Sequence, residues 1–342
     1  MTDLSTLDFP AAPEPRPGLV IPPSIALSGE KASVVAERSP LKGLRYVAMA
    51  VPNLREALAF YRDVWGLYTV AMDGNVAYLG AVGTPEPYIL RLRESPERRL
   101  DVIAFAAKSA DAVDTLATEL GTAGFKIDRE PAPLQTPGGG YGFRFFDIDG
   151  RLIEVSSDVR PKPFRDLEEG ESIPRKMSHV VVTSPDTAKT RAFYEQYLGF
   201  RLSDYLSERM CFMRCSTDHH SLAIAQHDNV SVNHVSFEMR GIDEYLRGTG
   251  RLIRTGFEPL WGPGRHSAGD NTYAYFQDPN GYVVEYTTEL EQILDEDAWQ
   301  PRIWPTDNEY ADQWGTGGSG EDLYALKNKG TPDEGLWTSV PV

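Results

Sequence analysis

The sequence is poor in several features, and each shortage excludes a class of protein. Its 342 residues include only two cysteines, Cys211 and Cys215, which predicts buried thiols and not a disulfide framework. A metal site built on this CxxxC spacing is the weaker alternative, because no second cysteine pair exists. No apolar run is long enough to cross a bilayer, and the start, MTDLSTLDFPAAPEPRPG, lacks the regions of a signal peptide. We therefore expect a cytoplasmic protein.

Basic residues are also scarce. The 34 Lys and Arg residues face 50 Asp and Glu residues, a net charge of -16, and they form no basic stripe. Neither nucleic acid nor an anionic membrane surface is therefore expected as a partner, and a small molecule is favoured. Histidine is missing from the first half of the chain altogether. The second half holds all six: His179, His219, His220, His227, His234 and His266.

What the sequence does contain is an internal repeat. LRYVAMAVPNLREALAFYRDVWGL (44–67) matches MSHVVVTSPDTAKTRAFYEQYLGF (177–200), and FFDIDGRLIEV (145–155) parallels YFQDPNGYVVEY (275–286). A weaker unit follows the first in each half, and every unit reads as a strand, a helix and about three more strands. The prediction is an α+β fold in which four βαβββ modules form two paired-module, barrel-like domains.

Shifts in composition divide the chain into five segments. A chain of this length has enough apolar residues for two domain cores. The final segment is acidic but contains tryptophans, so we expect it to pack over a domain or a neighbouring subunit. The segments are a proline-rich arm (1–43), an N-terminal domain (44–160), a linker (161–176), a histidine-bearing C-terminal domain (177–289) and the tail (290–342).

Aligning the repeats singles out three side chains that could share one cavity. His179, His234 and Glu285 lie on three different predicted strands of the second half. Because side chains alternate along a strand, the apolar face of each strand leaves these three on the opposite face. At the matching positions, the first half has Tyr46, Val102 and Glu154.

Two imidazoles and one carboxylate are the usual ligand set of non-haem Fe(II) enzymes that activate oxygen. A metal ion would also neutralise Glu285, whose buried charge is otherwise costly. The alternative is that each histidine is a satisfied core residue and that Glu285 pairs with a nearby lysine or arginine. Glu154 favours this alternative, because the same carboxylate is present in the half that has no histidines.

The second half resembles the catalytic domain of type I extradiol ring-cleavage dioxygenases of the vicinal oxygen chelate superfamily. The resemblance rests on MSHVVV, CSTDHHSLAIA, NHVSF and GRHSAGDNTYAYFQDPNGYVVEY, and it extends over about residues 44–288. It implies that the C-terminal domain is catalytic and the N-terminal domain is not. The implied reaction opens the ring of a catechol-type substrate with O2 at a non-haem Fe(II) centre and gives a muconic semialdehyde type of product.

The resemblance also assigns roles to individual residues. It implies that His179, His234 and Glu285 bind the iron, although Mn(II) accepts the same ligands. His220 would act as acid and base beside the oxygen site, while His266 and Tyr275 would hydrogen-bond the hydroxyl oxygens of the substrate. His219 matches a family position whose role stays open. A homo-oligomer is expected from the family alone.

Several alternatives remain at this point. The same fold hosts glyoxalase-like metal-dependent isomerases and epimerases, which need a carboxylate base near the substrate, and non-catalytic proteins that bind a small molecule. His220 could instead lie on the surface of a hairpin, and Tyr275 could fill the barrel. The arm and the tail lie outside the resemblance, so the sequence does not identify the substrate.

Overall fold

The computed structural model describes residues 19–20, 39–328 and 331–340. The predicted N-terminal arm lies outside the described residues, except for the short strand β1 (Leu19–Val20) and the segment from residue 39 onward. Strand β2 begins at Leu41, slightly before the predicted domain boundary at residue 44. The apolar pattern misses this start because Lys42 and Gly43 interrupt it.

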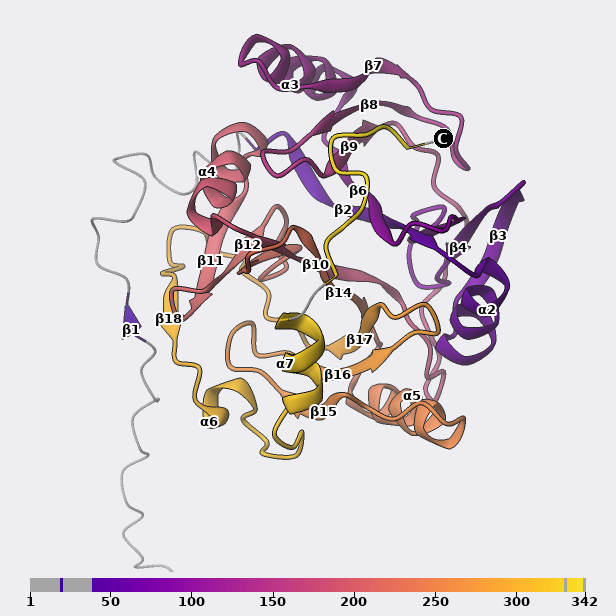
Figure 1. Cartoon of the computed structure of the whole chain (residues 1–342), viewed down its shortest axis with the longest axis vertical. Helices are drawn as coiled ribbons and strands as arrows, with labels where there is room; N and C mark the ends of the chain where they lie inside the picture. Colours follow the sequence, from indigo (N-terminus) through magenta and orange to yellow (C-terminus); the bar gives the residue numbers. More distant parts are fainter. Residues whose placement is uncertain (1–18, 21–38, 329–330, 341–342) are drawn as a thin grey trace, which may run out of the picture.

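The predicted four modules are all present, and each consists of a strand, a helical segment and three further strands. In the first-half sheet, the strand order is β3-β4-β5-β2-β6-β9-β8-β7 (Figure 1). The first module comprises β2 (Leu41–Val51), α2 (Leu54–Leu58), the π-helical segment η3 (Ala59–Trp65), β3 (Tyr68–Asp73), β4 (Val76–Gly80) and β5 (Leu90–Glu94). The second comprises β6 (Arg99–Ala107), α3 (Ala110–Thr122), β7 (Ile127–Pro133), β8 (Tyr141–Phe146) and β9 (Leu152–Ser157).

The second half repeats this arrangement in a larger sheet, with the order β1-β18-β11-β12-β13-β10-β14-β17-β16-β15. The α+β fold with four modules is therefore confirmed. The third module comprises β10 (Lys176–Ser184), α4 (Thr187–Leu198), β11 (Arg201–Leu206), β12 (Met210–Arg214) and β13 (Leu222–Gln226). The fourth comprises β14 (Ser231–Glu238), α5 (Ile242–Arg254), β15 (Trp261–Arg265), β16 (Thr272–Gln277) and β17 (Val283–Thr288).

Local sequence explains where the helices begin and end. The side chain of Ser109 accepts a hydrogen bond from the Ala112 amide at the start of α3, and Asp186 accepts one from Lys189 at the start of α4. These caps satisfy amides that have no partner within the helix. Helix α4 ends at Gly199, whose left-handed backbone (φ 66°) favours glycine.

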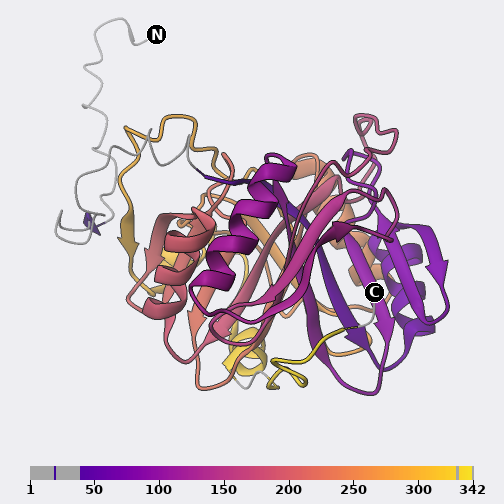
Figure 2. The same ribbon diagram turned by 90° about the horizontal axis from the view of Figure 1, so that it is seen from above.

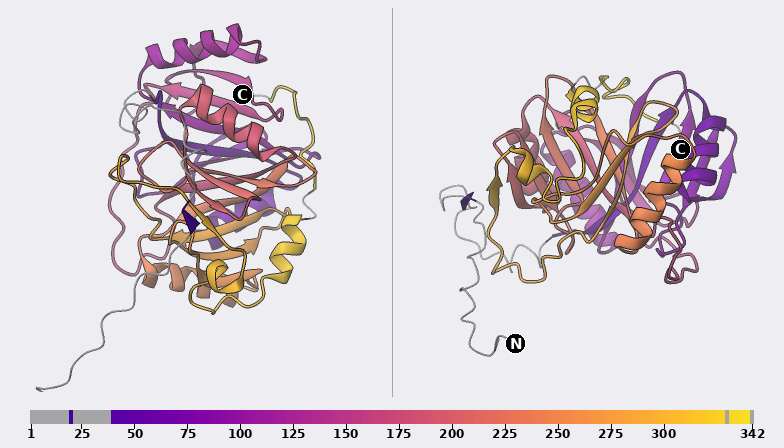
Figure 3. Two further views of the ribbon diagram at one scale, coloured as in Figure 1. Left: turned by 90° about the vertical axis from the view of Figure 1, so that its left-hand side faces the viewer. Right: turned by 90° about the horizontal axis from the view of Figure 1, so that it is seen from below.

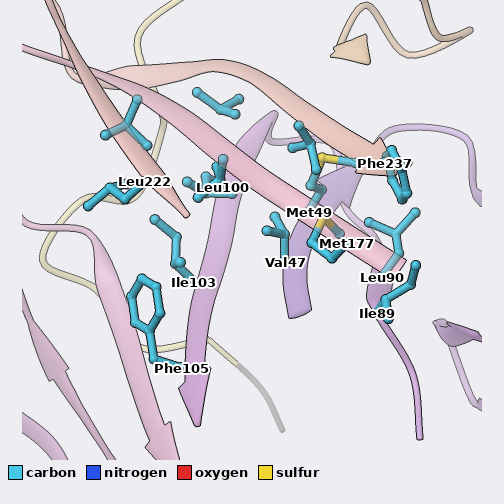
Figure 4. Close-up of a cluster of buried hydrophobic side chains, with 14 of the residues drawn as sticks. Val47, Met49, Ile89, Leu90, Leu100, Ile103, Phe105, Met177, Leu222 and Phe237 are labelled. Carbon is cyan, nitrogen blue, oxygen red and sulfur yellow. The ribbon is translucent and has the colours of Figure 1, made fainter. Parts of the chain in front are cut away.

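The two sheets pack against each other through one continuous hydrophobic core (Figure 4). Val47 on β2 and Ile103 on β6 belong to the same buried cluster as Met177 on β10 and Phe237 on β14. The opposite face of the second-half sheet carries His179 and His234. The division into two domains, with a linker at 161–176, remains a prediction, and residues 158–175 contain no helix or strand.

Residues of the repeated motifs also hold the two halves together. The Tyr61 hydroxyl, from the Ala-Phe-Tyr motif of the first half, donates to Asp278 Oδ2 in the DPNG turn of the second half at 2.9 Å. Reciprocally, the Tyr194 hydroxyl donates to Asp147 Oδ2 in the DIDG turn at 3.0 Å. Each half therefore supplies a tyrosine to a buried carboxylate of the other. Figure 2 shows α3 and α4, one from each half, lying side by side.

The tail packs over both halves, as the sequence predicts. Its strand β18 (Arg302–Trp304) pairs with β11, and its helices are α6 (Asn308–Ala311) and α7 (Glu321–Asn328). Figure 3 shows both helices at the end of the molecule opposite α3. Further along, Trp337 contacts Phe146 and Val340 is buried against the first-half sheet.

The two cysteines are free, buried thiols, as expected. Burial raises the pKa of both Cys211 and Cys215 to about 12. Neither thiol is therefore ionised near neutral pH, and neither belongs to a metal-ligand cluster among the described residues. Within the described part of the chain, no helix combines the length and apolar character needed to span a membrane.

We predict that Tyr61→Phe lowers the free energy of unfolding by about 1 to 3 kcal/mol above about pH 7, because the Asp278 carboxylate loses a donor. Burial raises the pKa of Asp278 to about 6. This group therefore favours folding less as the pH rises through about 6, and the missing donor should matter most above that pH. Urea denaturation near about pH 5 and about pH 8 measures the difference.

Tyr68→Phe is the matched control, because no hydrogen bond involves the Tyr68 hydroxyl among the described residues and this ring lies at the surface. Its stability should equal that of the parent chain at both pH values. An equal loss in Tyr61→Phe at both pH values would contradict the role assigned to the ionised carboxylate.

Candidate metal centre

Neighbouring strands of the second-half sheet bring His179, His234 and Glu285 together. His179 lies on β10, His234 on β14 and Glu285 on β17, and Ser236 pairs with both His179 and Glu285. One ligand atom from each of the three side chains can be chosen so that all lie within 4.8 Å of one another. The Nε2 atoms of His179 and His234 are 3.0 and 3.3 Å from Glu285 Oε2.

Alternation along the strands produces this convergence, as the sequence predicts. Val180 and Val182 point into the hydrophobic core, whereas His179 points to the opposite face. Val235 and Val284 likewise lie in the core, next to His234 and Glu285. All three polar side chains are almost completely buried, with exposures of 2%, 3% and 0%.

Neighbouring polar groups orient the two imidazoles. His234 Nδ1 lies 2.8 Å from Asn233 Oδ1, and His179 Nδ1 lies 3.0 Å from the Ser178 hydroxyl. Because Asn233 Oδ1 can only accept, His234 Nδ1 carries the hydrogen and Nε2 carries the lone pair. This is the arrangement by which outer polar groups prepare histidine ligands for a metal.

The charge on Glu285 also fits a cation. Burial alone would raise the pKa of Glu285, whereas a positive charge on the facing imidazoles of His179 and His234, in the place that a metal cation would take, holds this pKa well below its usual range. The carboxylate is therefore ionised, and neither of its oxygens accepts a well-directed hydrogen bond from the described residues. A buried carboxylate that faces two imidazole nitrogen atoms offers the ligand types of a divalent metal site. The positive charge of the ion would also neutralise this carboxylate.

Glu154, the counterpart in the first half, is neutralised in another way. Strand pairing places Arg144 opposite Glu154 and Tyr275 opposite Glu285. Arg144 Nε and Nη2 each lie 2.8 Å from Glu154 Oε2, so a guanidinium cation neutralises that carboxylate. Tyr275 is neutral and leaves the charge of Glu285 available. The persistence of a carboxylate in both halves thus has a physical explanation.

His220 lies beside the three clustered residues at the end of a hydrogen-bonded chain. Its ring centre is 4.2 Å from that of His179, and it is buried instead of lying on a hairpin surface. His220 Nδ1 is 3.0 Å from His219 Nδ1, and His219 Nε2 is 3.1 Å from Asp204 Oδ2. Since a carboxylate only accepts, His219 donates from Nε2 and accepts from His220 Nδ1.

This chain leaves the lone pair of His220 on Nε2. Burial lowers the pKa of His220 well below its usual value, and His179 and His219 lower it further. The imidazole is thus neutral near physiological pH. A neutral imidazole whose free nitrogen lies in a cavity can take up a proton from a ligand.

His266 and Tyr275 form a second polar pair. His266 Nδ1 lies 2.8 Å from the Ala311 carbonyl, which fixes Nδ1 as the donor and Nε2 as the acceptor. The Tyr275 hydroxyl, 2.9 Å away, therefore donates to His266 Nε2. Burial raises the pKa of Tyr275 well above 10, and the charge of Glu285 adds to this effect. The phenol remains protonated and can donate a hydrogen bond.

A cavity of about 630 Å³ connects these groups. The sequence does not predict most of the residues that line this cavity. The alternation on β12 is an exception, because Cys211 and Met213 lie in the core and Phe212 therefore faces the cavity. The tail contributes Thr306, Tyr310, Ala311 and Tyr324. Other lining residues include Val181, Leu206, Ser207, Arg209, Met210, Phe212, Gln226, Asn233, Trp261, Ala268 and Asn271.

Comparison with known proteins identifies relatives along most of the chain. Residues 43–155 and 176–286 match the Glyoxalase/Bleomycin resistance protein/Dioxygenase superfamily. A solved structure described as the Mn(II)-bound glyoxalase from Novosphingobium aromaticivorans has 43% identity and a TM-score of 0.84, and the match covers 88% of this chain and 99% of the other.

Curated relatives carry ring-cleavage names. Metapyrocatechase 2 of Cupriavidus necator is 26% identical over 305 residues, which cover 83% of this chain and 92% of the relative. Biphenyl-2,3-diol 1,2-dioxygenase of Paraburkholderia xenovorans (strain LB400) is 30% identical over 268 residues, or 72% of this chain and 87% of the relative.

We predict that Tyr275→Arg weakens metal uptake without unfolding the chain, because it recreates the ion pair that Arg144 forms with Glu154. A guanidinium next to Glu285 would occupy the place of the cation, and Mn(II) affinity should fall at least about tenfold. Metal content after dialysis and the electron paramagnetic resonance of free Mn(II) measure this loss.

Tyr275→Phe is the control, since it keeps the ring and adds no charge, and it should still bind the metal. Circular dichroism establishes that both variants are folded. Retention of one Mn(II) per folded chain by Tyr275→Arg would contradict the assignment of Glu285 as a ligand.

Proposed function

The chain belongs to the glyoxalase/bleomycin resistance protein/dioxygenase superfamily, and from this premise we propose that it is an extradiol dioxygenase. It opens the ring of a catechol-type substrate with O2 at an Fe(II) or Mn(II) ion. The observation that carries this proposal is the cluster of His179, His234 and Glu285 beside a cavity that a neutral His220 and a protonated Tyr275 also line.

The proposed metal ligands are His179 Nε2, His234 Nε2 and an oxygen of Glu285. These residues fit a divalent ion because the carboxylate is ionised and Asn233 directs the lone pair of His234 inward. When bound, such an ion holds the diol and O2 next to each other and conducts electron density between them. Both oxygen atoms enter the product, so the reaction needs no other reductant.

The remaining polar groups of the site move or hold protons. A diol that binds a cation through both oxygens must lose a proton, and the lone pair on His220 Nε2 can accept one. Tyr275 can turn its hydroxyl from His266 to a substrate oxygen, where it stabilises negative charge. Burial of these groups excludes bulk water, which strengthens both interactions.

We assign His219 a positioning role, which the sequence leaves open. Asp204 Oδ2 accepts a hydrogen bond from His219 Nε2, and this fixes the orientation in which His219 Nδ1 receives the hydrogen of His220. Asp204 is itself fixed, because the Trp304 indole and the Arg302 amide each donate to it at 2.7 Å. The chain from Asp204 to His220 therefore keeps His220 Nε2 free of hydrogen.

A metal-dependent isomerase is the second candidate, because the solved structure with 43% identity is described as a glyoxalase. Isomerases of this kind need a carboxylate base at the substrate. Among the described residues that line the cavity there is no aspartate or glutamate, and Glu285 is committed to the metal. The dioxygenase is therefore favoured. The homo-oligomeric state and the cytoplasmic location remain predictions.

Loading the protein with Fe(II) without air, then adding O2 and a panel of catechols, tests the reaction. We predict that one O2 is consumed per catechol and that a yellow ring-opened product forms, because both oxygen atoms are incorporated. An oxygen electrode and mass spectrometry with labelled O2 measure the two quantities. Conversion that proceeds equally well without O2 would instead establish the isomerase.

Asp204→Asn should lower kcat by about tenfold to a hundredfold, the usual effect of removing a partner that orients an active-site histidine. The metal content and KM should change little, because Asp204 touches neither the metal ligands nor the cavity. Imidazole nitrogen chemical shifts should reveal a changed tautomer of His220, which a purely structural role would leave unaltered. Unchanged shifts together with unchanged kcat would contradict the positioning role.

A further inference from the structure

One charged side chain stands out among those that line the cavity. Apart from histidines, Arg209 is the one ionisable charge among the described residues of the wall. No hydrogen bond or ion pair to its guanidinium group occurs within the described part of the chain, although its backbone amide is bonded. Arg209 is exposed, so it lines the cavity where the cavity meets solvent, and it places a positive charge there on a chain whose net charge is -16.

The backbone around Arg209 is held in place. Arg209 lies two residues after Ser207, which has a left-handed backbone (φ 48°), in the tight turn between β11 and β12. The Arg209 amide bonds to the Leu206 carbonyl and the Ser207 hydroxyl, and the Arg209 carbonyl accepts a hydrogen bond from Gln226 at 2.7 Å. The backbone of Arg209 is therefore fixed while its guanidinium group stays available, which suits a residue that contacts a ligand at the cavity mouth.

The spacing of residues along β12 gives the distance between Arg209 and the end of the cavity that contains His220. The ring of Phe212 is 5.0 Å from that of His220. Met210 lies on the same face of the strand, and Arg209 precedes it. Since a strand advances by about 3.3 Å per residue, the backbone of Arg209 lies about 10 Å from that of Phe212. An arginine side chain can reach part of the way back along this wall.

The size of the cavity points to a substrate that fills this distance. Its volume of about 630 Å³ lies in the range of roughly 300 to 1,000 Å³ that holds drug-sized ligands. A bare catechol would leave much of this space to water. Much of the wall is aromatic or apolar, and it includes Trp261, Phe212, Met210 and Tyr310. An extended aromatic diol fits a cavity of this size and lining.

We propose that the natural substrate is an aromatic diol with a carboxylate on a side chain, and that Arg209 binds this carboxylate while the diol lies at the metal. This inference rests on the proposed function and deepens it by adding the substrate class. A guanidinium group pairs with a carboxylate through two parallel hydrogen bonds. It also attracts an anion to a protein whose overall charge repels anions.

The test compares a catechol carrying a propanoate side chain with the matching propanamide, which has the same shape but no charge. Binding is measured anaerobically by calorimetry with the Mn(II)-loaded protein, so the result does not depend on turnover. The acid should bind more tightly than the amide. Arg209→Gln should weaken binding of the acid by about tenfold or more and leave the amide within about twofold.

Two further variants sharpen the comparison. Arg209→Lys keeps the charge without the two-pronged geometry, so it should retain part of the preference for the acid. Arg254→Gln removes an exposed positive charge at the end of α5, outside the cavity wall, and should change neither affinity. The proposal is overturned by equal affinities for acid and amide, by equal weakening of both in Arg209→Gln, or by no binding of either compound.

Turnover under air separates this inference from the function on which it rests. Consumption of O2 with a higher kcat/KM for the acid supports both. If the acid binds through Arg209 but no O2 is consumed, the dioxygenase assignment fails and the carboxylate site stands. If O2 is consumed with acid and amide at the same kcat/KM, the dioxygenase assignment stands and the role of Arg209 fails.

Discussion

A buried carboxylate on the last strand of each half sets the central constraint on this structure. Glu154 and Glu285 occupy equivalent positions and are almost inaccessible to water, so each needs a positive charge nearby. The first half supplies a guanidinium from the facing strand, whereas the second half presents two imidazole nitrogen atoms and a phenol. Three differences therefore separate the neutralised site from the one that can accept a metal: Arg144 stands where the second half has Tyr275, and Tyr46 and Val102 stand where it has His179 and His234.

The duplication has mechanical consequences as well. Tyr61 and Tyr194 reach across to the turns of the opposite half, and the two sheets share one continuous core. Among the described residues, the first half packs against the second and supplies none of the residues that line the cavity. A rigid sheet suits the clustered histidines, because small displacements of a ligand atom weaken metal binding and proton transfer. The half without histidines packs against the half that has them.

The sequence predicts the fold and the three clustered side chains because both depend on local periodicity. Alternation along β10, β14 and β17 determines that His179, His234 and Glu285 share a face. The pairing of Asp204 with His219 is not predictable in this way, since it depends on how β11 lies against a distant loop. For the same reason the sequence does not predict that Arg209 and Tyr310 line the cavity, because the cavity forms only where the β11–β12 turn and the tail meet.

The tail holds in place the hydrogen-bonded chain that runs from Asp204 through His219 to His220. Trp304 and Arg302 donate to Asp204, which orients His219, while Ala311 accepts from His266. Tail residues therefore orient His220, through Asp204 and His219, and also His266, and Tyr310 and Tyr324 add to the cavity wall. Further on, Val340 is buried against the first-half sheet. Because the same segment anchors on one half and completes the cavity of the other, the reactive geometry depends on docking of the tail as much as on the four modules.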